Sequence, residues 1–316
     1  MKTTTRRSGD AAVFAAIVGS ILLAGCAARD AGPAATEVAT PPPPETPTRE
    51  HLLAATVSGP WAEPVTLAAG RYDGPPAAPG AASHPTLELL QPTVLFGDID
   101  GTPPNEAVAL LAASEGGTGE FIHLGVFAMR DGRAESIATA PIGDRVQLFR
   151  AWLERQVIHM DVIEAGPGEP ACCPTQLTRK AFSLQDGKLV QVENEAVSSL
   201  SVNLLAATDW MLVEMDGQPL PEGLLPPTAL IQYGKVTGFA GCNRYNGPLT
   251  ESKPGVIKLG ALTATEKACD GAATALETQF LERLGHTGAY TFAAGRLVLS
   301  APKAAPGGPG TLVFAR

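Results

Sequence analysis

Short apolar runs alternate with turn residues along the chain between residues 54 and 195. This alternation is typical of an antiparallel meander, in which tight turns connect neighbouring strands. Asp131-Gly132 and Asp186-Gly187 are strong tight-turn dipeptides between such runs. Residues 121–129 are apolar at both parities, which predicts a central strand covered on both faces. The expected strands cover residues 94–96, 107–113, 121–129, 136–142, 146–152, 156–163, 176–184 and 188–192.

The second half of the chain combines similar short strands with one helix. Asp270 is a suitable N-cap and Gly285 a suitable C-cap for this helix. Between them, four apolar residues recur at helical spacing: Leu276, Phe280, Leu281 and Leu284. The expected strands cover residues 210–215, 229–233, 236–240, 256–259, 290–293, 297–299 and 312–314. We therefore predict an α+β domain with one helix packed on a strongly bent antiparallel sheet.

Composition narrows the classes of protein that fit this pattern. The chain has 316 residues, a net charge of −9, 17% charged residues and 45% hydrophobic residues. A negative chain is unsuited to nucleic acid, whose binding needs a dense basic face. The hydrophobic content argues against a mostly disordered chain. We predict a two-domain, β-rich protein, with an all-β antiparallel meander at residues 54–200 and the α+β domain at residues 208–316.

The first 25 residues have the organisation of a signal peptide. Lys2, Arg6 and Arg7 form a positive segment, and an apolar run from 11 to 25 follows. This run is shorter than the roughly 20 residues that span a bilayer, so it fits the hydrophobic region of a secretory signal. It ends in Leu22-Leu23-Ala24-Gly25-Cys26, which resembles a bacterial lipobox.

The resemblance to a lipobox implies that the Cys26 thiol is diacylated and that the chain is cut before this residue. Two or three acyl chains hold a protein stably at a membrane where one does not. Residue 27 is Ala rather than Asp, so we expect an outer-membrane anchor that faces the periplasm. Residues 26–53, rich in proline and alanine, would form a tether. Two alternatives stay open: an ordinary signal peptide with an incidental cysteine, and a twin-arginine signal at Arg6-Arg7.

Four cysteines remain besides Cys26, and they allow three connectivities. We predict a Cys242–Cys269 disulfide, because this bond closes a loop within one domain and the periplasm is oxidising. Cys172 and Cys173 are adjacent, and neighbouring Cα atoms lie about 3.8 Å apart, below the usual disulfide range of about 4.4–6.8 Å. Three interpretations of this pair stay open: a strained vicinal disulfide, two buried thiols, or a redox or metal site.

An acidic segment begins like a calcium-binding loop. Asp98 and Asp100 alternate as in such a loop, and Gly101 follows. The residues after it replace the third carboxylate and its glycine, so Asn105 and Glu106 remain as remote ligands. A calcium ion takes 6–8 oxygen ligands. We therefore favour a plain acidic turn and keep Asp98, Asp100 and Glu106 as the weaker hypothesis of a metal site.

No motif for catalysis is evident in the sequence. The five histidines are scattered, and there is no Gly-x-Ser-x-Gly elbow and no Walker lysine. We expect neither enzyme activity nor a cofactor. Strand parity predicts that the loops at 116–119 and 172–173 lie at one end of the meander and the loop at 98–100 at the other. The first two loops would then form a shared binding rim.

Several motifs of the second half occur in a characteristic order. Residues 241–247 read Gly-Cys-Asn-Arg-Tyr-Asn-Gly, residues 265–269 read Thr-Glu-Lys-Ala-Cys, and Trp210 and Glu277 flank them. Together they resemble the META domain, or HslJ-like, family over residues 208–316. Glu266-Lys267 departs from the family, which more often has a basic residue and a methionine there. The first half resembles a region upstream of META domains in some bacterial lipoproteins, on residues 96–101, 116–119, 142–146 and 171–174.

The resemblance implies an envelope or secreted protein, because members of the family are mostly of this kind, some heat-inducible, without a settled enzymatic activity. We expect a lipid-anchored, non-catalytic envelope protein that binds a protein partner or supports the envelope under stress. The alternatives are a periplasmic binder of a small ligand and, third, a hydrolase or redox enzyme. Residues 241–247 would form a structural turn, or a ligand-facing loop in which Arg244 and Tyr245 are exposed to a partner.

Overall fold

The structure is a computed structural model that describes residues 45–76, 80, 83–302 and 310–316. The predicted signal peptide, Cys26 and most of the predicted tether lie outside these residues. Residues 43–316 form one compact unit. Within the described part of the chain, no helix is both long enough and apolar enough to cross a membrane.

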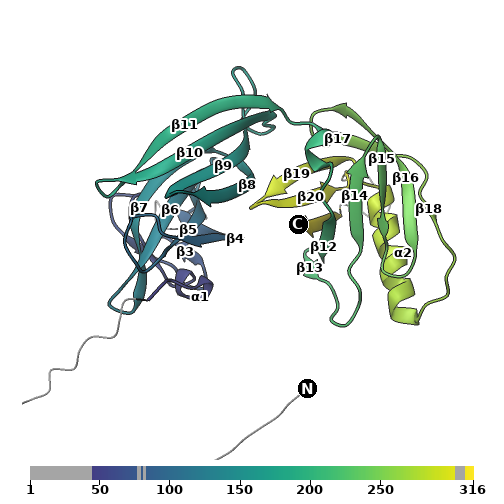
Figure 1. The fold of residues 1–316 in the computed structure, drawn as a ribbon, viewed down its shortest axis with the longest axis horizontal. Coiled ribbons are helices and arrows are strands. Elements are labelled where there is room, and N and C mark those ends of the chain that lie inside the picture. The colour runs from purple at the N-terminus through teal and green to yellow at the C-terminus, as the bar shows by residue number, and fades with distance from the viewer. Residues whose placement is uncertain (1–44, 77–79, 81–82, 303–309) are drawn as a thin grey trace, which may run out of the picture. The chain divides into compact units, whose positions relative to one another are not determined.

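Seven strands form the first sheet, in the order β2-β1-β7-β6-β5-β4-β3. Strands β3 to β7 are labelled in Figure 1. The strands from β3 to β7 form the predicted antiparallel meander, and β1 extends it by pairing in parallel with β7. The bounds are β1 Thr56–Val57, β2 Val65–Thr66, β3 Arg71–Asp73, β4 Thr86–Gly97, β5 Glu106–Ser114, β6 Phe121–Arg130 and β7 Arg133–Asp144. In β6, Leu124 and Phe127 are buried in different core clusters, which confirms the prediction of a central strand covered on both faces.

The first half contains two sheets rather than one continuous meander. β7 continues to Asp144, and Arg145 then takes a left-handed conformation (φ 52°), with its backbone N–H bonded to the Glu120 carbonyl at 2.7 Å. The chain leaves the first sheet there and builds a second one, in the order β11-β10-β9-β8. Its bounds are β8 Gln147–Glu154, β9 Val157–Glu164, β10 Gln176–Gln185 and β11 Lys188–Ser199. The apolar residues of both sheets share one core cluster.

Ordered structure begins before residue 54, so the predicted end of the tether at residue 53 is wrong. Thr48 caps a short helix, α1 (Arg49–Leu52), through a hydrogen bond from the His51 backbone N–H to Thr48 Oγ1 at 3.2 Å. His51 Nδ1 accepts the Thr48 backbone N–H at 3.3 Å, which completes a capping box. Leu52 is fully buried in the core beneath the first sheet.

The second half forms a ten-stranded antiparallel sheet that contains all the predicted strands. Its order is β13-β12-β14-β15-β16-β17-β19-β20-β21 with β18 paired to β16, and an additional pairing of β12 with β21 closes the path into a ring. The sheet is thus bent so strongly that its two ends pair, which agrees with the predicted strong bend. The bounds are β12 Trp210–Met215, β13 Gln218–Pro219, β14 Thr228–Gln232, β15 Lys235–Phe239, β16 Arg244–Lys253, β17 Val256–Leu259, β18 Thr263–Ala264, β19 Ala289–Ala293, β20 Arg296–Ser300 and β21 Thr311–Ala315. A short 3₁₀ helix, η1 (Val202–Leu205), precedes β12.

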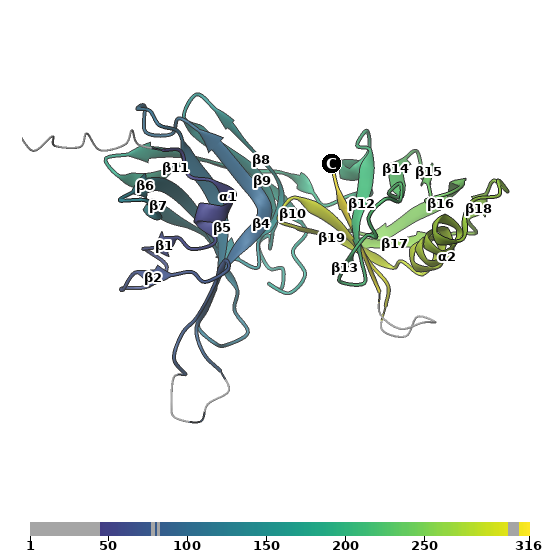
Figure 2. The ribbon, with the colours of Figure 1, turned by 90° about the horizontal axis from the view of Figure 1, so that it is seen from below.

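The predicted helix is α2 (Gly271–Gly285), and its C-cap is His286 rather than the predicted Gly285. It lies beside this sheet in Figure 2. Asp270 caps it, because its Oδ1 accepts the Ala273 backbone N–H at 2.8 Å. Phe280 is fully buried, and its ring meets those of Tyr245 and Phe314 edge-on, at 5.5 and 6.4 Å between ring centres. These contacts bind the helix to the core of the sheet.

Candidate functional site

Asn243 is the centre of a hydrogen-bond network at the most characteristic motif of the second half. It lies in the turn before β16 and is only 6% exposed. Its Oδ1 accepts Thr265 Oγ1 and the Lys267 backbone N–H, each at 2.8 Å. Its Nδ2 donates to the Lys267 carbonyl and to Glu277 Oε1, each at 3.2 Å. The motif therefore joins the turn, the 265–269 loop and α2, which is a structural role.

The predicted Cys242–Cys269 disulfide is present and reinforces the same junction. The Cα atoms of the two cysteines lie 6.1 Å apart, within the usual range for such bonds. Because the bond joins the turn before β16 to the residue before the Asp270 cap, it closes a loop of 27 residues. On the chain-entropy model, a loop of this length contributes on the order of 3–4 kcal/mol.

The prediction that Tyr245 is exposed to a partner is wrong. Arg244 is exposed, but Tyr245 is 2% exposed and its hydroxyl donates to the Thr228 carbonyl at 2.9 Å. Burial raises the pKa of the Tyr245 hydroxyl. Both residues belong to strand β16 rather than to a turn or loop. The side chains of this strand alternate between exposed and buried from Arg244 onward. Only residues 241–243 turn, and Gly241 takes a positive φ of 105° there.

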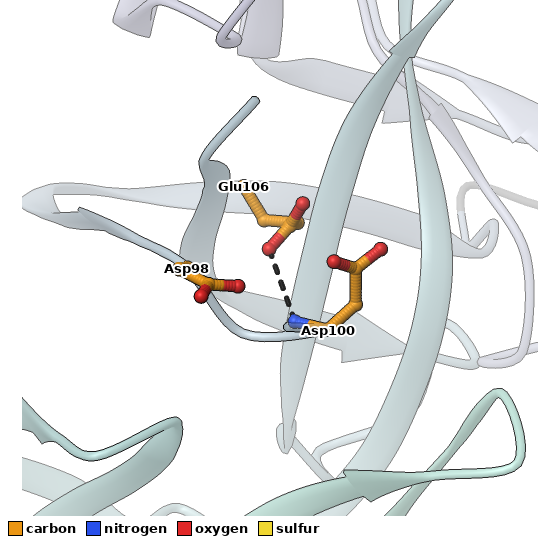
Figure 3. A group of neighbouring side chains, drawn as sticks. All are labelled: Asp98, Asp100 and Glu106. Atoms are coloured by element: carbon orange, nitrogen blue, oxygen red, sulfur yellow. Dashed lines mark hydrogen bonds between the residues drawn. The ribbon is translucent and has the colours of Figure 1, made fainter. Parts of the chain in front are cut away.

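The three carboxylates considered as a metal site lie together at one end of the first sheet. One carboxylate oxygen from each of Asp98, Asp100 and Glu106 lies within 4.8 Å of the others. Figure 3 shows the three side chains. The loop already uses these groups, however. Asp98 Oδ1 accepts the Gly101 N–H at 2.7 Å, and Asp100 Oδ1 accepts the Thr102 N–H at 2.8 Å. The arrangement therefore supports the interpretation of an acidic turn.

Glu106 is the only member of this group that is buried, at 3% exposure. Its Oε2 accepts the backbone N–H groups of Ile99 at 2.7 Å and Asp100 at 3.3 Å. Burial raises the pKa of Glu106, the nearby Asp100 charge adds to that effect, and the two backbone donors oppose it. Glu106 thus holds the loop in its turn, which is the role that a bound ion has in a calcium loop.

Cys172 and Cys173 lie on the loop between β9 and β10, and both are exposed thiols rather than the buried thiols considered above. Their Sγ atoms are 2.7 Å apart. The loop is held by Glu169, whose Oε2 accepts the N–H groups of Gly166 at 2.9 Å and Thr175 at 3.0 Å. The hydrogen bonds from Thr175 and Gly166 hold the pKa of Glu169 below its usual value.

Two cavities lie at the end of the strands where strand parity places the 116–119 and 172–173 loops. A cavity of about 470 Å³ is lined by both cysteines, Lys253 and Tyr290, with apolar walls from proline, leucine and valine residues. A second, of about 450 Å³, is lined by Thr118 and Arg145. Gln147 lines both cavities. The two loops thus line neighbouring cavities rather than one shared pocket. At the opposite end, Gln156 Nε2 donates to Asp98 Oδ2 at 3.1 Å, as the parity argument requires.

The second sheet carries an ionic cluster that the sequence does not predict. Asp161, 2% exposed, accepts Arg150 Nε at 2.6 Å and Arg179 Nε at 2.8 Å. Burial opposes ionisation of Asp161, but the two arginines outweigh it and lower the pKa of this carboxyl. Trp152 stacks on His159 at 5.1 Å, and Arg150 lies over the Trp152 ring at 5.0 Å. The register between neighbouring strands brings these residues together, and no local sequence motif predicts the cluster.

Comparison with known proteins supports the resemblance in the second half. Residues 203–308 match the family model described as "META domain". The match confirms the resemblance of this part of the chain to the META domain, which suggests an envelope-associated protein. One solved chain, "NMR structure of the protein from Burkholderia xenovorans", is 28% identical, with 40% of this chain and 95% of that chain covered and a TM-score of 0.29. A search of curated proteins found no match.

Proposed function

We propose that this protein is a lipid-anchored, non-catalytic protein of the bacterial outer membrane that faces the periplasm and binds an extended segment of a protein partner along β11. The observation that carries the proposal is the open edge of this strand. β11 pairs with β10 on one side, and no strand pairs with its other side among the described residues. An unpaired edge presents a row of backbone donors and acceptors to a further strand.

The length of β11 and its exposed valines also favour pairing. Natural proteins blunt such edges with short strands, prolines, charged side chains or bulges that turn the edge away. β11 has twelve residues and no proline, although two register shifts interrupt its pairing with β10 and Lys188, Glu193 and Glu195 are charged. Val190, Val192 and Val197 are 39%, 52% and 46% exposed. An added strand would cover these valines, while Glu193 and Glu195 would select against acidic partners.

Lipid anchoring at Cys26 would explain how such a protein is retained at the envelope. The META domain and the Cys242–Cys269 disulfide both fit an oxidising envelope compartment. The negative chain would be repelled by anionic headgroups, so acyl chains rather than charge would hold it at the membrane. In a fractionation experiment, Cys26→Ser should move the protein from the membrane to the soluble fraction. Unchanged membrane association of this variant would contradict the anchor.

Site-specific photocrosslinking in intact cells tests the use of the β11 edge. We expect a photoreactive residue at Val192 to give a discrete adduct with one protein. The matched control is Met211, which is 42% exposed in a strand already paired on both sides with β14 and β21. Val190→Lys should reduce the Val192 adduct at least fivefold, because an edge lysine opposes strand addition. Equal and diffuse products from positions 192 and 211, or insensitivity to Val190→Lys, would refute the proposed edge.

The cavity of about 470 Å³ favours a second candidate function, the binding of a small ligand. Its volume is within the range of about 300–1,000 Å³ that is typical of ligand sites. Apolar side chains dominate its walls, and Lys253 offers one charged group. Replacing Ala289, a wall residue, with tryptophan would fill this cavity and should leave the β11 crosslink unchanged. If Ala289→Trp abolishes the function of the protein in cells but leaves the β11 crosslink intact, the small-ligand candidate is favoured.

A further inference from the structure

The two cysteines of the β9–β10 loop have a geometry that neither of the proposed binding functions uses. Both cysteines are free and exposed, and their Sγ atoms lie 2.7 Å apart, within reach of each other. The Cys173 backbone N–H donates to the Pro170 carbonyl at 3.1 Å. Together with the Glu169 bonds, this contact presents both thiols on a fixed loop rather than on a free segment.

The surroundings of the pair fit a small molecule better than a metal ion. Both cysteines are exposed and line the 470 Å³ cavity. The only cluster of three or more metal-ligating side chains among the described residues is the Asp98 group, so the pair lacks the further ligands that zinc needs. Exchange with a disulfide is a characteristic reaction of an exposed dithiol.

We propose that Cys172 and Cys173 form a thiol–disulfide exchange site that accepts a low-molecular-weight disulfide in the cavity and becomes a vicinal disulfide. The Cys172 thiolate attacks one sulfur of the disulfide R–S–S–R, forms a mixed disulfide and releases R–S⁻. Cys173, as thiolate, then attacks the Cys172 sulfur and releases the second R–S⁻. The two protons of the cysteine thiols end on the two R–SH products. The cysteine pair is oxidised by two electrons, and the small disulfide is reduced by two.

The order of the two steps follows from the contacts of the pair. The hydrogen bond with Cys172 raises the pKa of the Cys173 thiol, an effect that the Lys253 charge only partly offsets. A raised pKa leaves less of Cys173 as thiolate at a given pH. We expect Cys172 to make the first attack, and Cys173 to resolve the mixed disulfide from its position 2.7 Å away.

This exchange site should differ in redox behaviour from the disulfide of the META domain. Cys242 and Cys269 have Cα atoms 6.1 Å apart, a separation that a disulfide spans without distortion. Adjacent cysteines have Cα atoms about 3.8 Å apart across a trans peptide, so their disulfide must distort the backbone. Strained disulfides are the more easily reduced. The two pairs should therefore be oxidised at well-separated ratios of oxidised to reduced glutathione.

A redox titration of the full chain, purified in detergent, tests this proposal. The chain is equilibrated in glutathione buffers of graded ratio, its thiols are alkylated, and its tryptic peptides are weighed. Residues 156–179 carry both Cys172 and Cys173, whereas Cys242 and Cys269 lie in the separate peptides 236–244 and 268–283. Cys26 lies before the cleavage site at Arg29, in none of these three peptides, so it does not interfere.

We expect the 156–179 peptide to change from two alkylated cysteines to none in one step. The equilibrium constant for its oxidation should be at least 100-fold smaller than that of Cys242–Cys269. Cys173→Ser should trap one glutathione on Cys172, and Cys172→Ser should form its adduct on Cys173 more slowly. Oxidised glutathione should also react faster than an oxidised thioredoxin-like protein, because the cavity admits small molecules. Unchanged circular dichroism would show that the variants fold.

Three results would overturn the proposal. The first is that both thiols stay alkylatable in excess oxidised glutathione. The second is that the wild-type peptide carries stable glutathione adducts instead of an internal disulfide. The third is that Cys172–Cys173 and Cys242–Cys269 are oxidised with the same equilibrium constant. Faster oxidation by the thioredoxin-like protein would refute the assignment of a small-molecule disulfide. None of these outcomes depends on the β11 edge or on Cys26, so the proposed function is tested separately.

Discussion

Replacement of Asn243 tests whether the most characteristic motif of the META domain is structural. The Asn243 side chain makes four hydrogen bonds to the 265–269 loop and α2, at 2.8–3.2 Å. Each such bond contributes about 0.5–1.5 kcal/mol net. Water can replace part of this at the exposed loop, and the Cys242–Cys269 disulfide keeps the loop attached. We therefore expect Asn243→Ala to lower the free energy of unfolding of this domain by about 2–4 kcal/mol.

The assay is urea unfolding followed by the fluorescence of Trp210, which is fully buried in the META domain. Trp61 and Trp152 are replaced by phenylalanine in every chain compared, so that the signal reports this domain alone. Asn246→Ala is the matched control, because Asn246 is an exposed asparagine on β16, which begins directly after Asn243. We expect this variant to stay within about 0.5 kcal/mol of the reference. A loss below about 0.5 kcal/mol for Asn243→Ala would refute the structural role.

Asn243→Asp adds a pH dependence whose sign the structure fixes. The new carboxylate would keep the two accepted bonds but would lie near Glu277 Oε1, which is 3.2 Å from Nδ2 in the native protein. Burial and the like charge would raise the pKa of the new aspartate in the folded state above its unfolded value of about 3.9. A raised carboxyl pKa means that stability is lost as the pH rises through it. The variant should thus be closer to wild type at pH 4 than at pH 7, and an equal loss at both would refute this contact.

Two further carboxylates give pH predictions of opposite sign. Because the pKa of Glu106 is raised by burial, its ionisation costs stability as the pH rises. Glu106→Gln keeps an acceptor for the Ile99 and Asp100 N–H groups. In thermal unfolding, its stability should therefore match or exceed that of the wild type at pH 7, and this advantage should disappear at pH 4. A loss of stability above about 1 kcal/mol at pH 7 would contradict this prediction. Asp161 has a lowered pKa, so its contribution is present at neutral pH and disappears as the pH falls through that pKa. Asp161→Asn should cost about 1–3 kcal/mol at pH 7 in urea unfolding, and a gap that does not narrow under acid would refute the arginine pairing.

The sequence was most informative where periodicity and local chemistry agree. Most of the longer strands of both halves, but not β16, follow from apolar spacing, and α2 follows from apolar spacing and its Asp270 cap. The disulfide followed from compartment and loop closure. The division into two sheets at Arg145 was not predictable, because it depends on one left-handed residue and on tertiary packing.

The errors arose where a glycine or asparagine has a packing role rather than a turn role. Gly247 lies within β16, where a Cβ would meet Leu262 Cδ2 at 2.6 Å, so glycine there serves the close approach of Leu262 rather than a turn. Tyr245 was assigned to the surface because its neighbours suggested a loop, yet strand alternation buries it against Phe280. The cluster around Asp161 depends on the register of three strands, which a single sequence does not reveal.

Metabolic labelling with an alkyne analogue of palmitate tests the membrane anchor most directly. Bacteria that express the full chain would be labelled, the protein purified and the tag detected, with Cys26→Ser as the matched control. The proposed function predicts a labelled wild-type chain and an unlabelled variant. An unlabelled wild-type chain, or equal labelling of both, would contradict the anchor on which the proposed envelope function depends.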